Sequence, residues 1–125
     1  MSAPRLPAAL EATALIRLAE SQGGFGMVLH RGEPDSGTIL IVILDNQGFG
    51  QTLARLFERL PNADGTRAWA LAKVQDPENK AEFEEYLKRR VAQDRDVWIV
   101  ELTIAEGEQF ILNLGNDENK PGFMG

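Results

Sequence analysis

The most informative hydrophobic pattern in this chain is the run Thr38–Leu44, TILIVIL, in which six apolar residues follow one threonine between turn signals. Four of these seven residues are β-branched, which favours a strand. Because the side chains of a strand alternate between its two faces, this strand is apolar on both and needs cover on both. The run therefore predicts an inner strand of a sheet.

A second strand is predicted just before it, over 25–31. Phe25, Met27 and Leu29 point to one face of that strand, and the residues between them point to the other. The segment 32–37, GEPDSG, has the proline, aspartate and glycine of a tight turn. We therefore expect the strands over 25–31 and 38–44 to form a hairpin.

Helical periodicity predicts two helices. The alanine-rich segment 8–22 is the first, with Leu10, Ala14 and Leu18 on one stripe that Leu15 and Ala19 widen. The second runs over 76–93, with Asp76 as its N-cap and Pro77 as its first residue. Its apolar residues recur at four-residue spacing, namely Phe83, Leu87 and Val91, with Tyr86 beside them.

The remaining strands are shorter or less clear. The segment 51–60 fits a helix by local pattern, but the short turn before it favours a strand that pairs with 38–44, and we predict a strand. Further strands are predicted over 66–72, 97–104 and 109–112. Residues 1–7 are expected to be an extended lead-in, and the glycine-rich segment 115–125 a flexible tail.

These elements predict one α+β domain over 1–114, in the order helix, four strands, helix, two strands. Its sheet is mainly antiparallel, with about five to six strands, because most strands follow one another through short turns. Two helices are expected on one face of the sheet. The apolar residues of the other face then need a second copy of the chain, so the sequence predicts a homodimer.

Composition excludes several classes of protein. The chain has 125 residues, 43% of them hydrophobic, no cysteine, and a net charge of -6. Without cysteine there is no disulfide, thiolate nucleophile or cysteine-ligated metal. The acidic charge makes nucleic acid an unlikely partner, because phosphate binding draws on clustered Lys and Arg. No apolar run approaches the ~20 residues of a membrane helix, and no signal-peptide pattern opens the chain, so a cytoplasmic protein is expected.

Few residues suggest catalysis. His30 is the single histidine, and Glu33 and Asp35 follow it, which suggests a base oriented by a carboxylate or simply a strand end beside an acidic loop. Asp94 and Asp96 end the second predicted helix, where they oppose the helix dipole. With Glu33 or Glu101 they could bind a cation, but a turn with aspartate side-chain bonds is favoured. We predict no metal site, no cofactor and no catalytic residue.

Two tryptophans and one glutamate are also candidates for contacts. Trp98 is expected in the core with its N–H bonded to a carbonyl, whereas Trp69, which shares a strand face with Arg67, is the better candidate for a surface contact. Glu101 lies on an otherwise apolar strand face. We expect it to pair with a cation on a neighbouring strand, either Arg55, Arg59 or Arg67.

Three segments carry a family resemblance: ALIRLAESQGGFGMVLHRGEPDSG, DGTRAW and EEYLKRRVAQDRDVWIVELTIAEGEQFI. They resemble a family of small alphaproteobacterial proteins, domain of unknown function fourteen ninety-one. Its G-D-P-D-A-G-like loop after a basic residue corresponds to Arg31–Gly37. Its D-P-D-L-W-V-V-E-like segment corresponds to Asp94–Glu101, with Arg95 in place of proline. The likeness spans about Pro4 to Leu114, is poor over 49–63, and implies an intracellular setting but no mechanism.

The leading hypothesis is a non-enzymatic interaction or regulatory module, with an unidentified protein partner as a further possibility. The alternative is a small-molecule-binding or hydrolytic enzyme with a pocket near His30, Asp35, Arg67 and Trp69. A nucleic-acid-binding protein is a third, and it requires six basic residues to share one surface: Arg17, Arg55, Arg59, Lys88, Arg89 and Arg90. The candidate ligand or partner contacts are His30, Arg31, Asp35, Arg67, Trp69, Asp94, Asp96 and Glu101.

Overall fold

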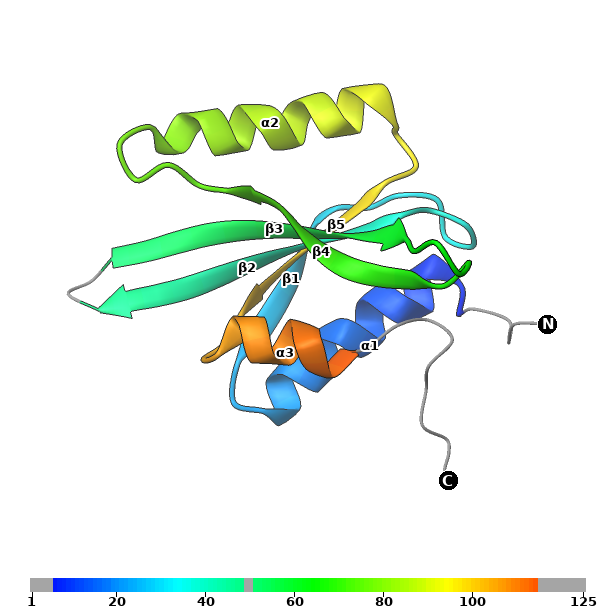
Figure 1. Ribbon diagram of the computed structural model, residues 1–125, viewed down its shortest axis with the longest axis horizontal. Helices are drawn as coiled ribbons and strands as arrows, with labels where there is room; N and C mark the ends of the chain where they lie inside the picture. Colours follow the sequence, from blue (N-terminus) through cyan, green and yellow to red (C-terminus); the bar gives the residue numbers. More distant parts are fainter. Residues whose placement is uncertain (1–5, 49–50, 115–125) are drawn as a thin grey trace.

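The computed structural model describes residues 6–48 and 51–114, which form three helices and five strands (Figure 1). The helices are α1 (Ala8–Ser21), α2 (Lys80–Gln93) and α3 (Gly107–Leu114). The strands are β1 (Phe25–His30), β2 (Ile39–Gly48), β3 (Gln51–Pro61), β4 (Arg67–Val74) and β5 (Trp98–Thr103). The predicted α+β class is confirmed, and so is the strand predicted over 51–60.

The five strands form one mixed sheet in the order β1-β5-β2-β3-β4. β2 and β5 run parallel, and the other three neighbouring pairs are antiparallel. The predicted hairpin of β1 and β2 is therefore wrong, because β5 lies between them. The segment that joins β1 to β2 is long enough to cross two strand spacings, about 10 Å, so its turn residues do not require the flanking strands to pair.

Residues 39–43 of β2 are buried on both faces, as predicted. Ile39, Ile41 and Ile43 point toward α1 and α3, whereas Leu40 and Val42 point toward α2. Figure 1 shows α2 on the opposite side of the sheet from α1 and α3. The prediction of two helices on one face, with the other face left for a second copy, is therefore wrong in its placement of α2. A single chain keeps residues 39–43 of β2 away from water, and the homodimer stays a prediction without this support.

α1 packs on the sheet through its small side chains. Ala8, Ala12, Leu15 and Ala19 are buried, whereas Leu10 and Leu18 of the predicted stripe are exposed. Alanine allows the helix to approach the strands closely, and a side chain at Gly26 of β1 would crowd Ile16 of α1. The prediction is confirmed for Leu15 and Ala19 and wrong for Leu10, Ala14 and Leu18, because the buried side of α1 is centred on its alanines rather than on the Leu10–Leu18 line.

Two further boundaries differ from the prediction. The segment predicted as a last strand, 109–112, belongs to α3, where Gly107, Phe110 and Ile111 are buried and Leu114 packs against them. Their i, i+3, i+4, i+7 spacing is helical. α2 starts after Asn79 rather than at Asp76, whose carboxylate instead accepts the Glu78 N–H at 2.9 Å in a preceding turn. The predicted tail, residues 1–5 of the lead-in and 49–50 lie outside the described residues.

Candidate functional site

A groove of about 540 Å³ lies between α2 and the sheet. Most of its lining is apolar and comes from four strands and the helix, including Leu29, Val42, Leu44, Leu87, Val91 and Ile99. A few polar side chains join them, namely His30, Gln75, Glu84, Lys88 and Glu101. An apolar hollow of this size with a few convergent polar groups is typical of a binding site.

The groove is open because α2 covers only part of its sheet face. Ion pairs hold the helix over β3 and β4: Arg90 lies 2.9 Å from Glu58, and Glu82 lies 3.0 Å from Lys73. β1, at the opposite edge of the sheet, has no such cover from the part of the chain that the structure describes. Its side chains on this face, Phe25, Met27 and Leu29, are 59%, 50% and 43% exposed. The groove therefore continues into an exposed apolar strip along β1.

Glu101 lies in the floor of this groove. In the register of the sheet it stands beside Met27 of β1 and Val42 of β2. Its carboxylate makes no hydrogen bond or ion pair with any of the residues that the structure describes. Burial raises the pKa of the Glu101 carboxyl above its usual value. A carboxylate among apolar side chains without a cation costs stability, which is a feature more typical of function than of packing.

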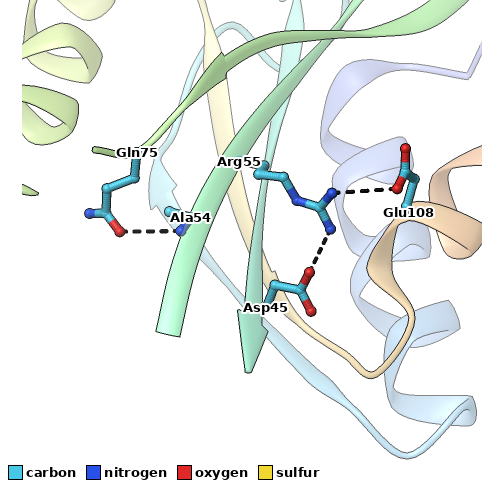
Figure 2. A network of polar contacts seen from close by, with 5 residues as sticks. All are labelled: Asp45, Ala54, Arg55, Gln75 and Glu108. Atoms are coloured by element: carbon cyan, nitrogen blue, oxygen red, sulfur yellow. Dashed lines mark hydrogen bonds and ion pairs between the residues drawn. The ribbon is translucent and has the colours of Figure 1, made fainter. Parts of the chain in front are cut away.

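The predicted cationic partners of Glu101 lie on the opposite face of the sheet. Figure 2 shows Arg55 between Asp45, at 2.7 Å, and Glu108, at 3.5 Å. Arg59 pairs with Glu11 of α1. The same close-up shows Gln75, which lines the groove, accepting the Ala54 N–H at 3.2 Å. The predicted ion pair between Glu101 and an arginine of β3 is therefore wrong. Leu56, not Arg55, stands opposite Val42 in the sheet, so the arginines of β3 point toward α1 and α3.

Replacement of Glu101 is expected to stabilise the free protein at neutral pH. Because the folded carboxyl has a raised pKa, the folded state holds its proton more tightly than the unfolded state. The ionised Glu101 carboxylate therefore destabilises the folded state at pH values above its raised pKa. This penalty disappears at pH values below the usual glutamate pKa of 4.5, where the carboxyl is protonated in both states. Glu101→Gln should raise the free energy of unfolding by about 0.5 kcal/mol at pH 7, since the half-buried group keeps some water. Urea unfolding at pH 7 and pH 3.5 measures the difference.

The matched control for this prediction is Glu85→Gln, which removes the same charge from the exposed side of α2. Its stability should equal that of the parent at both pH values. If Glu101→Gln were less stable than the parent at pH 7, the carboxylate would have a stabilising partner and the description of the groove floor would be wrong.

His30 lies at one end of the groove because of a bulge in β1. The register shifts between Val28 and His30, which places His30 opposite Ile99 rather than on the face that simple alternation predicts. Its Nδ1–H donates to the Val97 carbonyl at 2.8 Å. The predicted base oriented by a carboxylate is therefore not formed: the partner of this ring nitrogen is a backbone oxygen.

Three other predicted contact residues, Arg31, Asp94 and Asp96, meet where the loop after β1 crosses the start of β5. The Arg31 guanidinium lies 5.6 Å from the centre of the Trp98 ring, and the buried Trp98 donates its N–H to the Glu33 carbonyl at 2.8 Å, as predicted. Asp94 accepts the Asp96 N–H at 3.1 Å, which confirms the predicted turn. This corner of the fold is built by hydrogen bonds, and no group of three potential ligands for a metal ion occurs among residues 6–48 and 51–114.

Asp35 and Arg67 line a separate polar cavity of about 260 Å³ beside the start of α1. Arg59 also lines it, holds Glu11 through two bonds of 2.7 and 2.9 Å, and stacks on Trp69 at 4.7 Å. Trp69 packs against the core on the α1 face instead of forming a free surface contact. The pocket predicted around His30, Asp35, Arg67 and Trp69 is therefore not assembled, since His30 lies in the groove.

The six basic residues considered for nucleic-acid binding do not share a surface either. Arg17 lies on α1, whereas Lys88, Arg89 and Arg90 lie on α2 across the sheet (Figure 1). Arg55, Arg59 and Arg90 pair with carboxylates of this chain. Within the described part of the chain, no helix combines the length and the hydrophobicity needed to cross a membrane.

Comparison with known proteins identifies the lineage. A family model described as "Protein of unknown function (DUF1491)" matches residues 6–112, which is most of the chain. The chain belongs to the DUF1491 family. The predicted resemblance is thereby confirmed, over almost the span that the sequence suggested. No curated protein sequence matches the chain significantly.

Solved structures, two of them described as DUF1491 proteins, have the same fold. A crystal structure of a DUF1491 protein from Caulobacter crescentus CB15 is 29% identical, with a TM-score of 0.68, and the match covers 79% of this chain and 88% of that one. An NMR structure of a DUF1491 protein from the same organism has 29% identity and a TM-score of 0.70 and covers 87% and 94%. A solution structure from A. tumefaciens has 26% identity and a TM-score of 0.61 and covers 82% and 89%.

The groove residues that sequence reasoning missed are those of α2. Leu87 and Val91 were expected in the core, but they are only partly buried and wall the groove. Glu84 and Lys88, one turn apart beside them, were not predicted to line a pocket, and Lys88 was considered only for nucleic-acid binding. The sequence signal for this groove was Glu101, an acid on an otherwise apolar strand face. A helix that packs over such a face cannot bury the unpaired carboxylate completely, so an open space beside the helix could be expected.

Proposed function

We propose that this DUF1491 protein is a cytoplasmic, non-enzymatic interaction module that binds a partner protein in the groove between α2 and the sheet. The observation that carries the proposal is the incomplete cover of that sheet face. Other elements expose large apolar side chains singly or in pairs, as α1 does with Leu10 and Leu18, whereas Phe25, Met27 and Leu29 of β1 stay exposed in one row next to the groove. Contiguous apolar surface of this kind on a soluble protein marks interaction sites.

Catalysis receives no comparable support. His30 is bonded to a backbone carbonyl, and Asp35 and Arg67 belong to the other cavity. A hydrolytic mechanism needs a nucleophile and a base within hydrogen-bond reach of each other. Glu101, the group with a raised pKa in the groove, has neither a second acid nor a cation bonded to it among the described residues.

A photo-crosslinking amino acid at Met27 tests the proposal. In the cells that naturally make the protein, we expect illumination to join position 27 to another protein. Leu71 on β4 is the matched control, because it is 52% exposed against 50% for Met27 but lies away from the groove. Leu29→Glu, which places a charge in the groove lining, should abolish the adduct at position 27.

The outcomes separate the hypotheses. An adduct at position 27 that is absent at 71 and lost in Leu29→Glu supports the interaction module. Equal adducts at both positions, or none, would contradict it. An adduct formed only with a second copy of the chain would replace the foreign partner with the predicted homodimer, and light scattering on the purified protein would then show a dimer.

A further inference from the structure

The uncovered strip of the sheet is about as wide as one helix. Five strands span roughly 20 Å, and a helix with its side chains is about 10 Å across, so one sheet face takes two helices. α1 and α3 together cover one face (Figure 1). On the other face α2 is the one helix among residues 6–48 and 51–114, and its ion pairs hold it toward β3 and β4. The vacant position lies beside α2, over β5 and β1.

The floor of that position carries one negative charge among apolar side chains. Glu101 of β5 stands next to Met27 of β1, with Ile99 and Leu29 nearby in the groove lining. Its carboxylate is half-buried and has no bonded cation among the described residues. The basic groups that line the groove are His30 of β1, which is bonded to a backbone carbonyl, and the exposed Lys88 of α2.

Resting on the proposed function, we infer that the groove takes a basic amphipathic helix of another protein, which lies beside α2 and pairs a Lys or Arg with Glu101. The apolar stripe of such a helix covers Met27, Leu29 and Ile99. A helix without the cation would cut the carboxylate off from water and leave it unpaired, which is strongly unfavourable. A basic side chain instead forms a charge-assisted hydrogen bond there. The Glu101 carboxylate thus favours amphipathic helices that carry a Lys or Arg at this position over helices that do not.

A second copy of this chain fits the position less well. The outer side of α2 is charged, with Glu85 and Arg89 exposed. α1 does have exposed leucines, Leu10 and Leu18, next to an exposed Arg17. It lies on the opposite face of the sheet, however, so its insertion into a neighbour's groove would be head-to-tail. Such contacts extend into rings or filaments and do not close a dimer.

The recognition chemistry can be tested with three probes of equal length: n-octylammonium, n-octanol and octanoate. Each is titrated into the full-length protein at pH 7 while the amide resonances of Leu29, Leu87 and Ile99 are followed by NMR. We expect octylammonium to bind roughly tenfold more tightly than octanol, as for a hydrogen bond to a charged group, and octanoate to bind weakest. Glu101→Gln should remove the preference for the amine, and Glu85→Gln should retain it.

Each result has a distinct meaning. If all three probes shift the groove residues with equal affinity, the groove binds apolar groups and the inferred cation is wrong, while the proposed function stands. If no probe shifts them, the proposed function fails as well. If the preference for the amine survives in Glu101→Gln, it arises from the overall negative charge and the inference is overturned.

The crosslink at Met27 supplies the second measurement. Its yield should fall at least severalfold in Glu101→Gln and be unchanged in Glu85→Gln. The attached peptide should contain a Lys or Arg among apolar residues spaced three or four apart. A peptide without a basic residue, or an adduct that Glu101→Gln does not weaken, would overturn the inference and leave the interaction module in place.

Discussion

Ile41→Ala is expected to lower the free energy of unfolding by about 3 to 4 kcal/mol. Ile41 is 0% exposed and lies at the centre of the sheet, between Phe57 of β3 and Val100 of β5. Its side chain belongs to the core under α1 and α3, so the shortened residue would leave a cavity that rigid neighbours cannot fill. Since a whole domain is stable by only about 5–15 kcal/mol, the loss should be plain in urea unfolding followed by circular dichroism.

The matched control is Leu71→Ala on β4, at a position that is 52% exposed. A large-to-small change at such a surface position should cost about 0.5 kcal/mol or less. If Ile41→Ala cost no more than Leu71→Ala, β2 would not be the inner strand of the sheet, and the arrangement of both helical layers around it would be wrong.

Local sequence patterns identified most strands and both faces of β2, but they could not identify which strands become neighbours. The turn at 32–37 is real, since Glu33 accepts the N–H groups of Asp35 and Ser36 at 2.8 and 2.7 Å. It does not make a hairpin, because β5 inserts between the two strands. The pairing of β2 with β5 joins residues that lie far apart in the chain, and a turn signal carries no information about such a strand.

The same reason explains the wrong placement of α2. The spacing of Phe83, Leu87 and Val91 shows which side of the helix is apolar. It does not show which face of the sheet that side will meet, because the path of the chain from β4 to β5 decides that. The homodimer was inferred because the second face of the sheet was expected to have no helix over it. In the structure α2 covers much of that face.

Two of the predicted contact residues, Glu101 and His30, line the candidate site. Glu101 stood out as an acid on an apolar strand face, and the structure places it in the groove floor. Whether an arginine of β3 can reach it depends on the β2–β3 register, and a shift of one residue would reverse the answer. The position of His30 depends in turn on a bulge. Packing across the whole sheet sets the strand register and the position of bulges. The periodicity of one strand therefore does not predict them.

Two motifs of the family resemblance, Arg31–Gly37 and Asp94–Glu101, pack against each other, and this contact leads to the second large effect. Glu33 donates its N–H to the Asp96 carbonyl at 3.0 Å, and Trp98 donates its backbone N–H to the Thr38 carbonyl at 2.7 Å. A Cβ at Gly32 would overlap the carbonyl group of Asp96. Because the obstacle is backbone rather than a flexible side chain, Gly32→Ala must separate the two segments.

We therefore expect Gly32→Ala to lower the free energy of unfolding by about 2 to 3 kcal/mol, again measured by urea unfolding. Gly65→Ala is the control, because Gly65 has φ +90° and nothing within 4 Å of an added Cβ. Its cost is confined to the left-handed backbone and should be about 1 kcal/mol. Equal costs at the two glycines would mean that the loop yields freely, so that the contact between the two segments could not be what fixes β1 beside β5.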